Sequence, residues 1–597
     1  MYRVFVLLLF FFSALFSKTD SLFIYHINIT NPKSEIFHIE LHTPQIDSQK
    51  ITFGISVWSP GSYSINNYWE KIQSLRAFDS LNNELEVDRI DSIRWQINNA
   101  QALKKISYKV KDFDDADFLD TSELDSTFGY YNGTALYLLP IGYENYEYQI
   151  DFNLPEDWSV ETSLDSISPN CFRAKSYDEL ADSPVLFGAN FKRWDFVHAG
   201  IDFSLVVKVN SDFFPDSSIA IIKEIVNAQT KFFSDTPVTK YKFLFNFNEN
   251  SDRFRGFYGA LEHLNSSVYY LPYIQKYELD VRNNFIGSTI SHEFFHIWNV
   301  KLLRPKELQT FNYFEPVRTN LLWFSEGVTE YYSNLLMVRN RIVPENKFWV
   351  DIHNKTEESG FVQYLDGGNS LAEISENAPF NSFYSFYSKG ALIGFYLDLK
   401  IRKLTDNVFS LDDVIKVLYE GYAKKKIGFT ENDLITILNS LTRTDFRGFF
   451  KDYIHSSEEL PHDYFLSLVG LTRKRMLPYF GIHFFLNDND EAVIDYVEEN
   501  SPAAKSRIKE NDILLRINNF ELNLIEDVES KIYSITQLLQ DLPADSAATF
   551  HIRRGNKKIN LSVTPILKER ELSKLIDVEN ISDEQKIFRE KILYGKK

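Results

Sequence analysis

The chain has 597 residues, of which 44% are hydrophobic and 25% are charged, a balance typical of a globular protein with several domains. Its net charge of −19 argues against a nucleic-acid partner, because a polyanion would be repelled. The single cysteine, Cys171, excludes an intrachain disulfide.

The N-terminus has the features of an export signal. Arg3 precedes an apolar run from Val4 to Phe16 that only Ser13 interrupts, and a polar segment follows. This order is typical of a secretory signal peptide, which we assign to residues 1–20. A membrane anchor is the alternative, but the run is too short to cross a bilayer. We expect cleavage and export, to the periplasm or the medium, with no transmembrane segment in the mature chain.

Residues 21–208 alternate between apolar and polar residues in short runs separated by turn residues. Phe37–Leu41 and Ile51–Val57 are two of these runs. Alternation with a period of two is typical of half-buried strands. The sequence therefore predicts a β-rich N-terminal domain over 21–208.

Helical and strand patterns mix in residues 209–400. An amphipathic helix is expected at Ser217–Phe233 and a strand at Tyr241–Phe247, and two further helix-like segments follow at Ile286–Val300 and Leu321–Leu336. The pattern indicates an α+β domain, so the whole chain is expected to be a multidomain α+β protein.

The two helix-like segments carry a predicted zinc site. His292 and His296 lie four positions apart, on one face of a helix, where both imidazoles can reach one ion. Glu293 adjoins the first histidine and is placed to accept a proton from the attacking water. Zinc in hydrolases takes three protein ligands and keeps one position open, and Glu326 supplies the third. We expect one Zn²⁺ on His292, His296 and Glu326, with Glu293 as general base.

The C-terminal third divides into three parts. Residues 401–471 are expected to be helical, with a capping box beginning at Thr430. Residues 472–567 resemble a PDZ domain, on the segments Ser501–Ala504 and Ile508–Asn518. The charged tail, residues 568–597, is predicted to be a helix or a solvated extension.

Five ordered motifs together resemble the glycyl aminopeptidase family of PDZ-containing zinc metallopeptidases, relatives of the larger gluzincin aminopeptidases. The motifs lie at Trp58–Tyr63, Tyr258–His263, His292–Pro305, Trp323–Tyr332 and Tyr387–Gly390. The resemblance covers nearly the whole mature chain. It implies a thermolysin-like catalytic domain over 209–400 and the same zinc ligands and general base that the spacing predicts.

The resemblance also assigns residues to the substrate. Glu262, with Gly259 and Ala260 on the same segment, would bind the α-amino group, since an ammonium ion needs a charge-assisted acceptor. Without the resemblance, a surface acid on a strand is the favoured interpretation of Glu262. Tyr387 would donate to the oxyanion of the tetrahedral intermediate, with Tyr384 as the rival phenol.

The expected function is that of a zinc metallo-aminopeptidase, a hydrolase that removes small N-terminal residues, Gly or Ala, from peptides. One alternative is a zinc endopeptidase, which would lack an amine anchor, so that Glu262 discriminates between the two. Another alternative is a PDZ-bearing binding protein with a vestigial site. The PDZ segment is expected either to bind a peptide partner or to dock on the catalytic domain, because its carboxylate-binding loop, Tyr479–Ile482, matches only loosely.

Overall fold

The computed structural model describes residues 22–113, 118–208, 215–248, 259–272, 285–365, 368–378, 385–487, 489–522, 528–544 and 546–595. The chain forms two compact units. The first runs to Pro461 and resumes at Phe588, and the second is His462–Ile587. The second unit is therefore inserted into the first. The architecture is multidomain α+β, as predicted.

The N-terminal part is built from three sheets. The largest has the strand order β14-β15-β12-β1-β2-β8-β4-β5, and the smaller two have the orders β13-β16-β10-β9 and β11-β3-β7-β6. The alternation predicted from the sequence sets the core: Ile106, Tyr108 and Val110 of β8 are buried while the residues between them are partly exposed. The strands of the largest sheet are β1 (Phe23–Asn28), β2 (Ile36–His42), β4 (Ile72–Phe78), β5 (Glu84–Leu85), β8 (Lys105–Lys111), β12 (Tyr148–Asn153), β14 (Asp165–Ser168) and β15 (Cys171–Ala174). The smaller sheets comprise β3 (Ile51–Gly54), β6 (Val87–Arg89), β7 (Arg94–Ile97), β9 (Ser122–Leu124), β10 (Phe128–Tyr131), β11 (Leu139–Pro140), β13 (Ser159–Thr162) and β16 (Val185–Gly188), and two short helices accompany them, α1 (Gly133–Leu136) and α2 (Tyr177–Ala181).

A mixed sheet with the order β17-β18-β19-β21-β20 follows, and it joins the N-terminal part to the helices. Its strands are β17 (Phe191–His198), β18 (Ile201–Lys208), β19 (Lys240–Asn248), β20 (Gly259–Glu262) and β21 (Ser266–Pro272), and helix α3 (Pro215–Phe233) connects the parallel strands β18 and β19. The domain boundary expected at residue 208 therefore cuts through this sheet. Strand β20 lies at its edge, antiparallel to β21.

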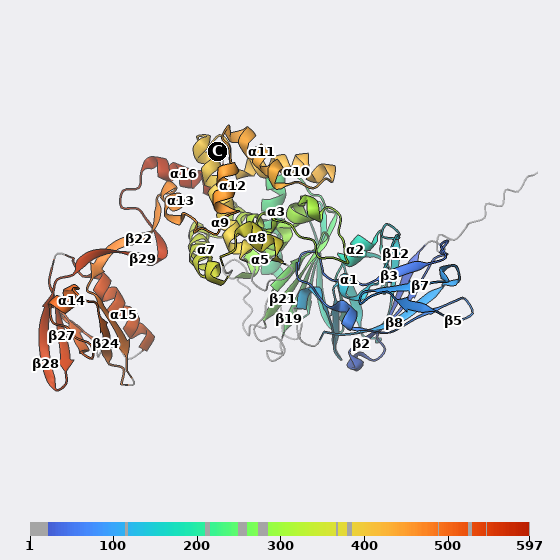
Figure 1. The fold of residues 1–597 in the computed structure, drawn as a ribbon, viewed down its shortest axis with the longest axis horizontal. Helices are drawn as coiled ribbons and strands as arrows, with labels where there is room; N and C mark the ends of the chain where they lie inside the picture. The colour runs from blue at the N-terminus through green and yellow to red at the C-terminus, as the bar shows by residue number, and fades with distance from the viewer. Residues whose placement is uncertain are drawn as a thin grey trace, which may run out of the picture. The chain divides into compact units, whose positions relative to one another are not determined.

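The mixed sheet packs against different partners on its two faces. Val206, Leu244 and Val268 meet residues of β10 and β16 on one face. Phe203 and Phe243 meet Phe294 of the metal-motif helix on the other. Figure 1 shows β19 and β21, in green, between the blue N-terminal strands and the helices.

Helices surround the metal motif. They are α5 (Phe285–Phe295), α6 (Thr329–Arg339), α7 (Glu345–Leu365), α8 (Leu371–Glu376), α9 (Phe386–Leu404), α10 (Leu411–Gly421), α11 (Glu431–Thr442) and α12 (Arg447–Tyr453), together with two π-helical segments, η6 (Ile297–Leu302) and η8 (Trp323–Val328). Helix α9 runs across the domain boundary expected at residue 400. Thr430 forms the predicted capping box with Asp433. In the described part of the chain, no helix combines the length and the apolar character that a membrane span requires.

The second unit contains a sheet with the order β23-β24-β25-β27-β28 and a separate two-stranded ribbon, β22-β29. Its elements are α13 (His462–Leu468), β22 (Leu471–Tyr479), β23 (Ile482–Leu486), β24 (Ala492–Val497), α14 (Pro502–Lys505), β25 (Ile513–Ile517), β26 (Phe520–Glu521), α15 (Val528–Asp541), β27 (Ala548–Arg554), β28 (Lys557–Val563) and β29 (Ile566–Asp577). The expected tail, residues 568–597, contains most of β29 and then α16 (Asp583–Tyr594). Phe588, Ile592 and Leu593 of α16 are buried.

Candidate metal centre

The two histidines of the motif face one another across a helical turn. His292 lies in the last turn of α5, His296 follows that helix directly, and their ring centroids are 4.6 Å apart. The turn into η6 is sharply bent, because Asn299 has non-helical φ/ψ of −122° and 91°. The carbonyl oxygen of Asn299 accepts a hydrogen bond from His296 Nδ1 at 2.8 Å, which orients the imidazole.

Glu326 brings a carboxylate oxygen to both imidazoles. It lies in η8 and is only 1% exposed. Its Oε2 atom is 3.4 Å from His292 Nε2 and 3.3 Å from His296 Nε2. The Nδ1 atoms of both histidines are engaged elsewhere, so the Nε2 lone pairs are available for a common ion. The three predicted ligands thus fit a divalent metal by type and by placement, with ligand atoms within 4.8 Å of one another.

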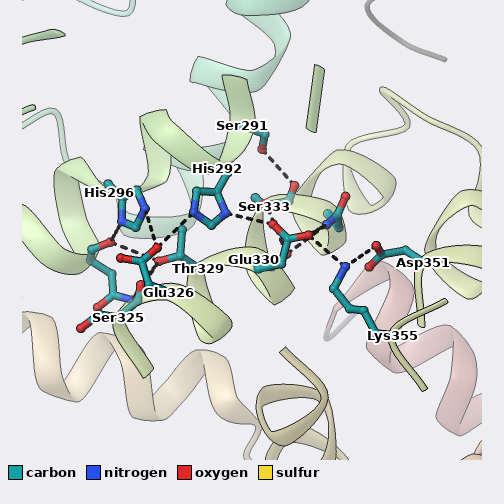
Figure 2. A network of polar contacts seen from close by, with 12 residues as sticks. Ser291, His292, His296, Ser325, Glu326, Thr329, Glu330, Ser333, Asp351 and Lys355 are labelled. Carbon is teal, nitrogen blue, oxygen red and sulfur yellow. Dashed lines mark hydrogen bonds and ion pairs between the residues drawn. The ribbon is translucent and has the colours of Figure 1, made fainter. Parts of the chain in front are cut away.

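A second carboxylate, that of Glu330, binds the His292 ring nitrogen that faces away from Glu326. Glu330, one turn after Glu326, accepts from His292 Nδ1 at 2.9 Å, and Lys355 donates to Glu330 at 2.9 Å. Lys355 also donates to Asp351. Figure 2 shows this series of contacts running from the imidazole through Glu330 to α7. A carboxylate on the far nitrogen fixes the tautomer and orientation of a metal-binding histidine. Glu330 was not predicted from the sequence, although its spacing from Glu326 is a helical one.

Glu293 has the environment of a general base. It is buried beside the two histidines, and burial raises its pKa to about 7, against the lowering effect of His292 and His296. A carboxyl group with a pKa near neutrality can both accept and return a proton. Glu293 therefore lies beside the two histidines, and its role as general base stays a prediction.

Glu262 is not a surface acid. It ends strand β20 and is 3% exposed. One of its carboxylate oxygens comes within 4.8 Å of ligand atoms of Glu293 and His296. Gly259 and Ala260, earlier on the same strand, pair with Tyr270 and Tyr269 of β21 and are partly exposed. Tyr258, which begins this motif, lies outside the described residues.

Lys301 and Asp182 connect Glu262 to the rest of the fold. The buried ammonium group of Lys301 lies 3.5 Å from Glu262 Oε1 and 3.0 Å from Asp182 Oδ1. Asp182 also accepts from His263 Nδ1 at 3.1 Å and from the backbone N–H of Leu264 at 2.9 Å. Burial raises the pKa of Asp182, but Lys301 and His263 together hold it well below its ordinary value. The carboxylate of Asp182 therefore fixes the end of β20 and the bend after α5 at the same time.

Tyr387 reaches the centre from the first turn of α9. Its ring centroid is 5.9 Å from that of His292. Burial and the charges of Glu326 and Glu262 raise its pKa well above the ordinary value, so it remains a donor. Glycines allow this approach, since a Cβ on Gly390 would lie 2.6 Å from the carbonyl oxygen of Trp323 in η8. The rival, Tyr384, lies outside the described residues.

A residue of the N-terminal part also reaches the metal ligands. Tyr63 donates its hydroxyl hydrogen to Glu326 Oε1 at 2.6 Å. Burial and the charges of Glu326 and Glu262 raise the pKa of Tyr63 well above its ordinary value. Tyr63 ends the motif Trp58–Tyr63, for which the sequence alone predicted no role.

Family models match most of the chain in three successive segments. The Peptidase M61 N-terminal domain matches residues 24–189, the M61 glycyl aminopeptidase domain matches residues 286–393, and a PDZ domain matches residues 478–564. The second of these segments contains all three candidate metal ligands, Glu293 and Tyr387.

The chain is similar to several solved structures. A crystal structure of an aminopeptidase N family protein from Idiomarina loihiensis has a TM-score of 0.70 at 25% identity, covering 95% of this chain and 100% of that one. An M1 zinc metallopeptidase from Deinococcus radiodurans has a TM-score of 0.46 at 9% identity, covering 74% and 95%. A mutant of that enzyme bound to a Tyr-Ser-Ala substrate has a TM-score of 0.48 at 10% identity, with the same coverage. No curated protein sequence matches the chain significantly.

The family segments follow one another in the order of the sequence motifs, and the catalytic segment coincides with the cluster of histidines and carboxylates described above. The chain belongs to the glycyl aminopeptidase family of metallopeptidases and is a metallo-aminopeptidase.

Proposed function

We propose that the protein is a zinc aminopeptidase that removes small N-terminal residues, Gly or Ala, from peptides. The observation that carries the proposal is the position of Glu262, a buried carboxylate beside Glu293 and His296. An endopeptidase has no need of an anionic group there. An aminopeptidase needs one to bind the substrate's ammonium group.

The donor set favours zinc, and a single ion. Two imidazoles and one carboxylate are the ligands of many catalytic zinc sites. A second set of candidate ligands exists, Glu262, Glu293 and His296, but it shares His296 with the first set. The ammonium group of Lys301, 3.5 Å from Glu262 Oε1, would repel a second cation there. Zinc held by His292, His296 and Glu326 would supply Lewis acidity to the scissile carbonyl and to the attacking water.

The protein's own groups would carry the proton transfers. Glu293 would accept a proton from the attacking water and pass it to the departing amine, for which a pKa of about 7 is well suited. Tyr387 would donate a hydrogen bond to the carbonyl oxygen as negative charge develops on it. Glu262 would hold the α-amino group, so that the first peptide bond of the substrate is the one presented.

The space beside Glu262 supports a preference for small residues. A cavity of about 10 Å³ borders this carboxylate, room for about one water molecule. Trp58, Tyr63 and Phe311 are among its walls. A cavity of this size has no room for a large side chain, and the size preference itself rests on the family resemblance.

The remaining assignments concern location and partners. The predicted signal peptide, residues 1–20, lies outside the described residues, and we propose export to the periplasm or the medium on its sequence alone. The PDZ domain matched at residues 478–564 is proposed to bind a peptide, from the substrate or from another protein.

One experiment tests the aminopeptidase assignment. Glycyl and alanyl peptides are compared with their N-acetylated forms, with and without a chelator. We expect the free peptides to be cleaved, the acetylated ones to resist, and the chelator to abolish cleavage. Glu262→Gln should raise KM for the free peptides by ten-fold or more, about 1.4 kcal/mol, if a charged contact is lost.

The control for Glu262→Gln is Glu161→Gln. Glu161 is also a buried glutamate that contacts a lysine, Lys242, but it lies on β13, in the N-terminal part. Equal cleavage of blocked and free peptides would instead indicate an endopeptidase.

A further inference from the structure

The segment Trp58–Tyr63, which follows β3 in the N-terminal part, is fixed against the segment between η6 and η8. The Trp58 indole nitrogen donates to the carbonyl oxygen of Asn312 at 2.7 Å, and Val57 N–H donates to that of Tyr313 at 2.8 Å. The backbone N–H of Asn66 returns to the Val57 carbonyl at 2.7 Å and closes the loop. The loop is therefore held at both ends.

Two residues inside this loop have a positive φ, which glycine adopts freely and tyrosine does not. Gly61 has φ of +102° and Tyr63 has φ of +61°. A positive φ is uncommon for a bulky residue and persists only where the surroundings impose it. Here the conformation directs the Tyr63 side chain into the catalytic domain, where its ring meets Phe386 of α9 edge-on at 6.2 Å.

The loop contacts Glu326, a proposed metal ligand, and Glu262, the proposed anchor of the substrate's amino group. The Tyr63 hydroxyl donates to Glu326 Oε1 at 2.6 Å, and both side chains are buried. A Cβ on Gly61 would lie 2.7 Å from Glu262 Oε1, and the φ of +102° disfavours any other residue, so glycine is needed beside the amine anchor.

The two oxygens of Glu326 thus have different partners. Oε2 is directed at the histidines, at 3.3–3.4 Å from their Nε2 atoms, while Oε1 accepts from Tyr63. Tyr387 also faces this carboxylate, but its proposed partner in the reaction is the substrate oxygen. A fixed donor on Oε1 prevents the carboxylate from rotating away from the metal position.

We propose that Tyr63 is a positioning residue of the metal centre: its phenol holds Glu326 so that Oε2 is presented to the ion. The N-terminal domain thereby contributes to metal binding as well as to folding. The inference rests on the proposed zinc ligands. Loss of a hydrogen-bonding partner of a metal ligand typically lowers metal affinity by about 10- to 100-fold.

The test measures zinc affinity directly. The Kd for zinc of the full-length protein is determined by competition with a chromogenic chelator, for the native chain, Tyr63→Phe and a control, Tyr68→Phe. Tyr68 is a buried phenol five residues away that donates to the carbonyl oxygen of Asp120 at 2.5 Å and accepts from Asn66 Nδ2 at 3.2 Å, so its loss also removes buried hydrogen bonding. We expect Tyr63→Phe to raise the Kd by about 10- to 100-fold and Tyr68→Phe to leave it within about three-fold.

Folding is checked by circular dichroism of the metal-free variants. Tyr63→His keeps a hydrogen-bond donor, should recover part of the affinity, and replaces the Phe variant if that variant does not fold. Unchanged zinc affinity in a folded Tyr63 variant, or an equal loss in Tyr68→Phe, would overturn the proposal. Failure of the native chain to bind zinc would instead count against the proposed function.

Discussion

Glu293 and the metal ligands are neighbours, yet they have separable tasks. Glu293→Gln keeps the shape of the side chain but removes proton acceptance, so we expect zinc content near that of the native protein and a kcat lower by about 10²- to 10⁴-fold. His296→Ala removes a ligand, so zinc itself should be lost. Metal analysis beside steady-state rates separates the two classes. Near-native turnover in Glu293→Gln would refute the general-base assignment.

Asp182 gives the protein a pH-dependent part of its stability. The pKa of Asp182 is held well below its ordinary value of 3.8, so the unfolded chain binds more protons than the folded one as the pH falls toward and below 4. Its contribution is therefore fully present above about pH 5 and declines as the pH drops through 4 toward the folded-state pKa.

Asp182→Asn should remove this contribution. We expect the free energy of unfolding of the metal-free protein to fall by roughly 2–3 kcal/mol at pH 7, with a smaller difference from the native chain at pH 3.5. Urea unfolding of both proteins at the two pH values measures this. A difference that does not change with pH would show that the variant acts through lost packing and not through charge.

At the scale of elements, the packing of α9 on η8 sets the distance between Tyr387 and the metal ligands. A Cβ on Gly327 would lie 2.4 Å from the carbonyl carbon of Gly390, and a Cβ on Gly390 would lie 3.0 Å from Gly327 Cα. The two backbones touch at this pair of glycines. The separation between the oxyanion donor and the third metal ligand therefore depends on residues that take no part in the chemistry.

Gly390→Ala should force α9 away from η8. Overpacking of this kind costs about 1–3 kcal/mol, and a backbone neighbour cannot yield as a side chain can. We expect a lower midpoint of thermal unfolding and a reduced kcat, because Tyr387 moves with the helix. Gly394→Ala, one turn further along α9, is the control.

The Gly394 position is open enough for a methyl group. A Cβ there would meet Tyr331 Cβ at 3.4 Å, an ordinary contact, and alanine is the better helix former by up to about 1 kcal/mol. We expect Gly394→Ala to be neutral or slightly stabilising. If both variants behaved alike, close packing of the two glycines would not be what positions Tyr387.

At the scale of the whole molecule, the chain returns after the PDZ segment to the first unit, which contains the metal centre and is called the catalytic unit below. Residues from Phe588 onward belong to the first unit, and Arg339 of α6 donates to the carbonyl oxygen of Ile592 at 3.0 Å. Ile592 is fully buried, whereas Ile587 on the same helix is 53% exposed. The last turns of the chain therefore complete the core of a domain whose other residues precede the PDZ segment.

Ile592→Ala should destabilise the catalytic unit by about 2–5 kcal/mol, the usual cost of removing a buried isoleucine side chain. Ile587→Ala should change stability by less than about 0.5 kcal/mol. Chemical unfolding followed through the loss of zinc-dependent activity reports on this unit in both variants. A loss of stability in Ile592→Ala as small as that expected for Ile587→Ala would show that α16 does not stabilise the catalytic unit.

The sequence alone determined the parts of the centre that depend on local spacing. His292, Glu293 and His296 are within one helical turn, so their shared face follows from helix geometry. Glu326 was likewise predicted, because zinc in hydrolases needs a third protein ligand. The strands of the N-terminal part were predicted from the alternation of apolar and polar residues.

Tertiary structure alone decided what depends on contacts between distant segments. Tyr63 meets Glu326, and Asp182 meets Lys301, across 263 and 119 positions of sequence. No local pattern records such pairs, because the hydrogen bonds form only when the N-terminal loops pack on the metal helices. For the same reason, strands β17 and β18 fell on the wrong side of the expected boundary at residue 208: strand pairing, and not composition, determines the sheet to which a strand belongs.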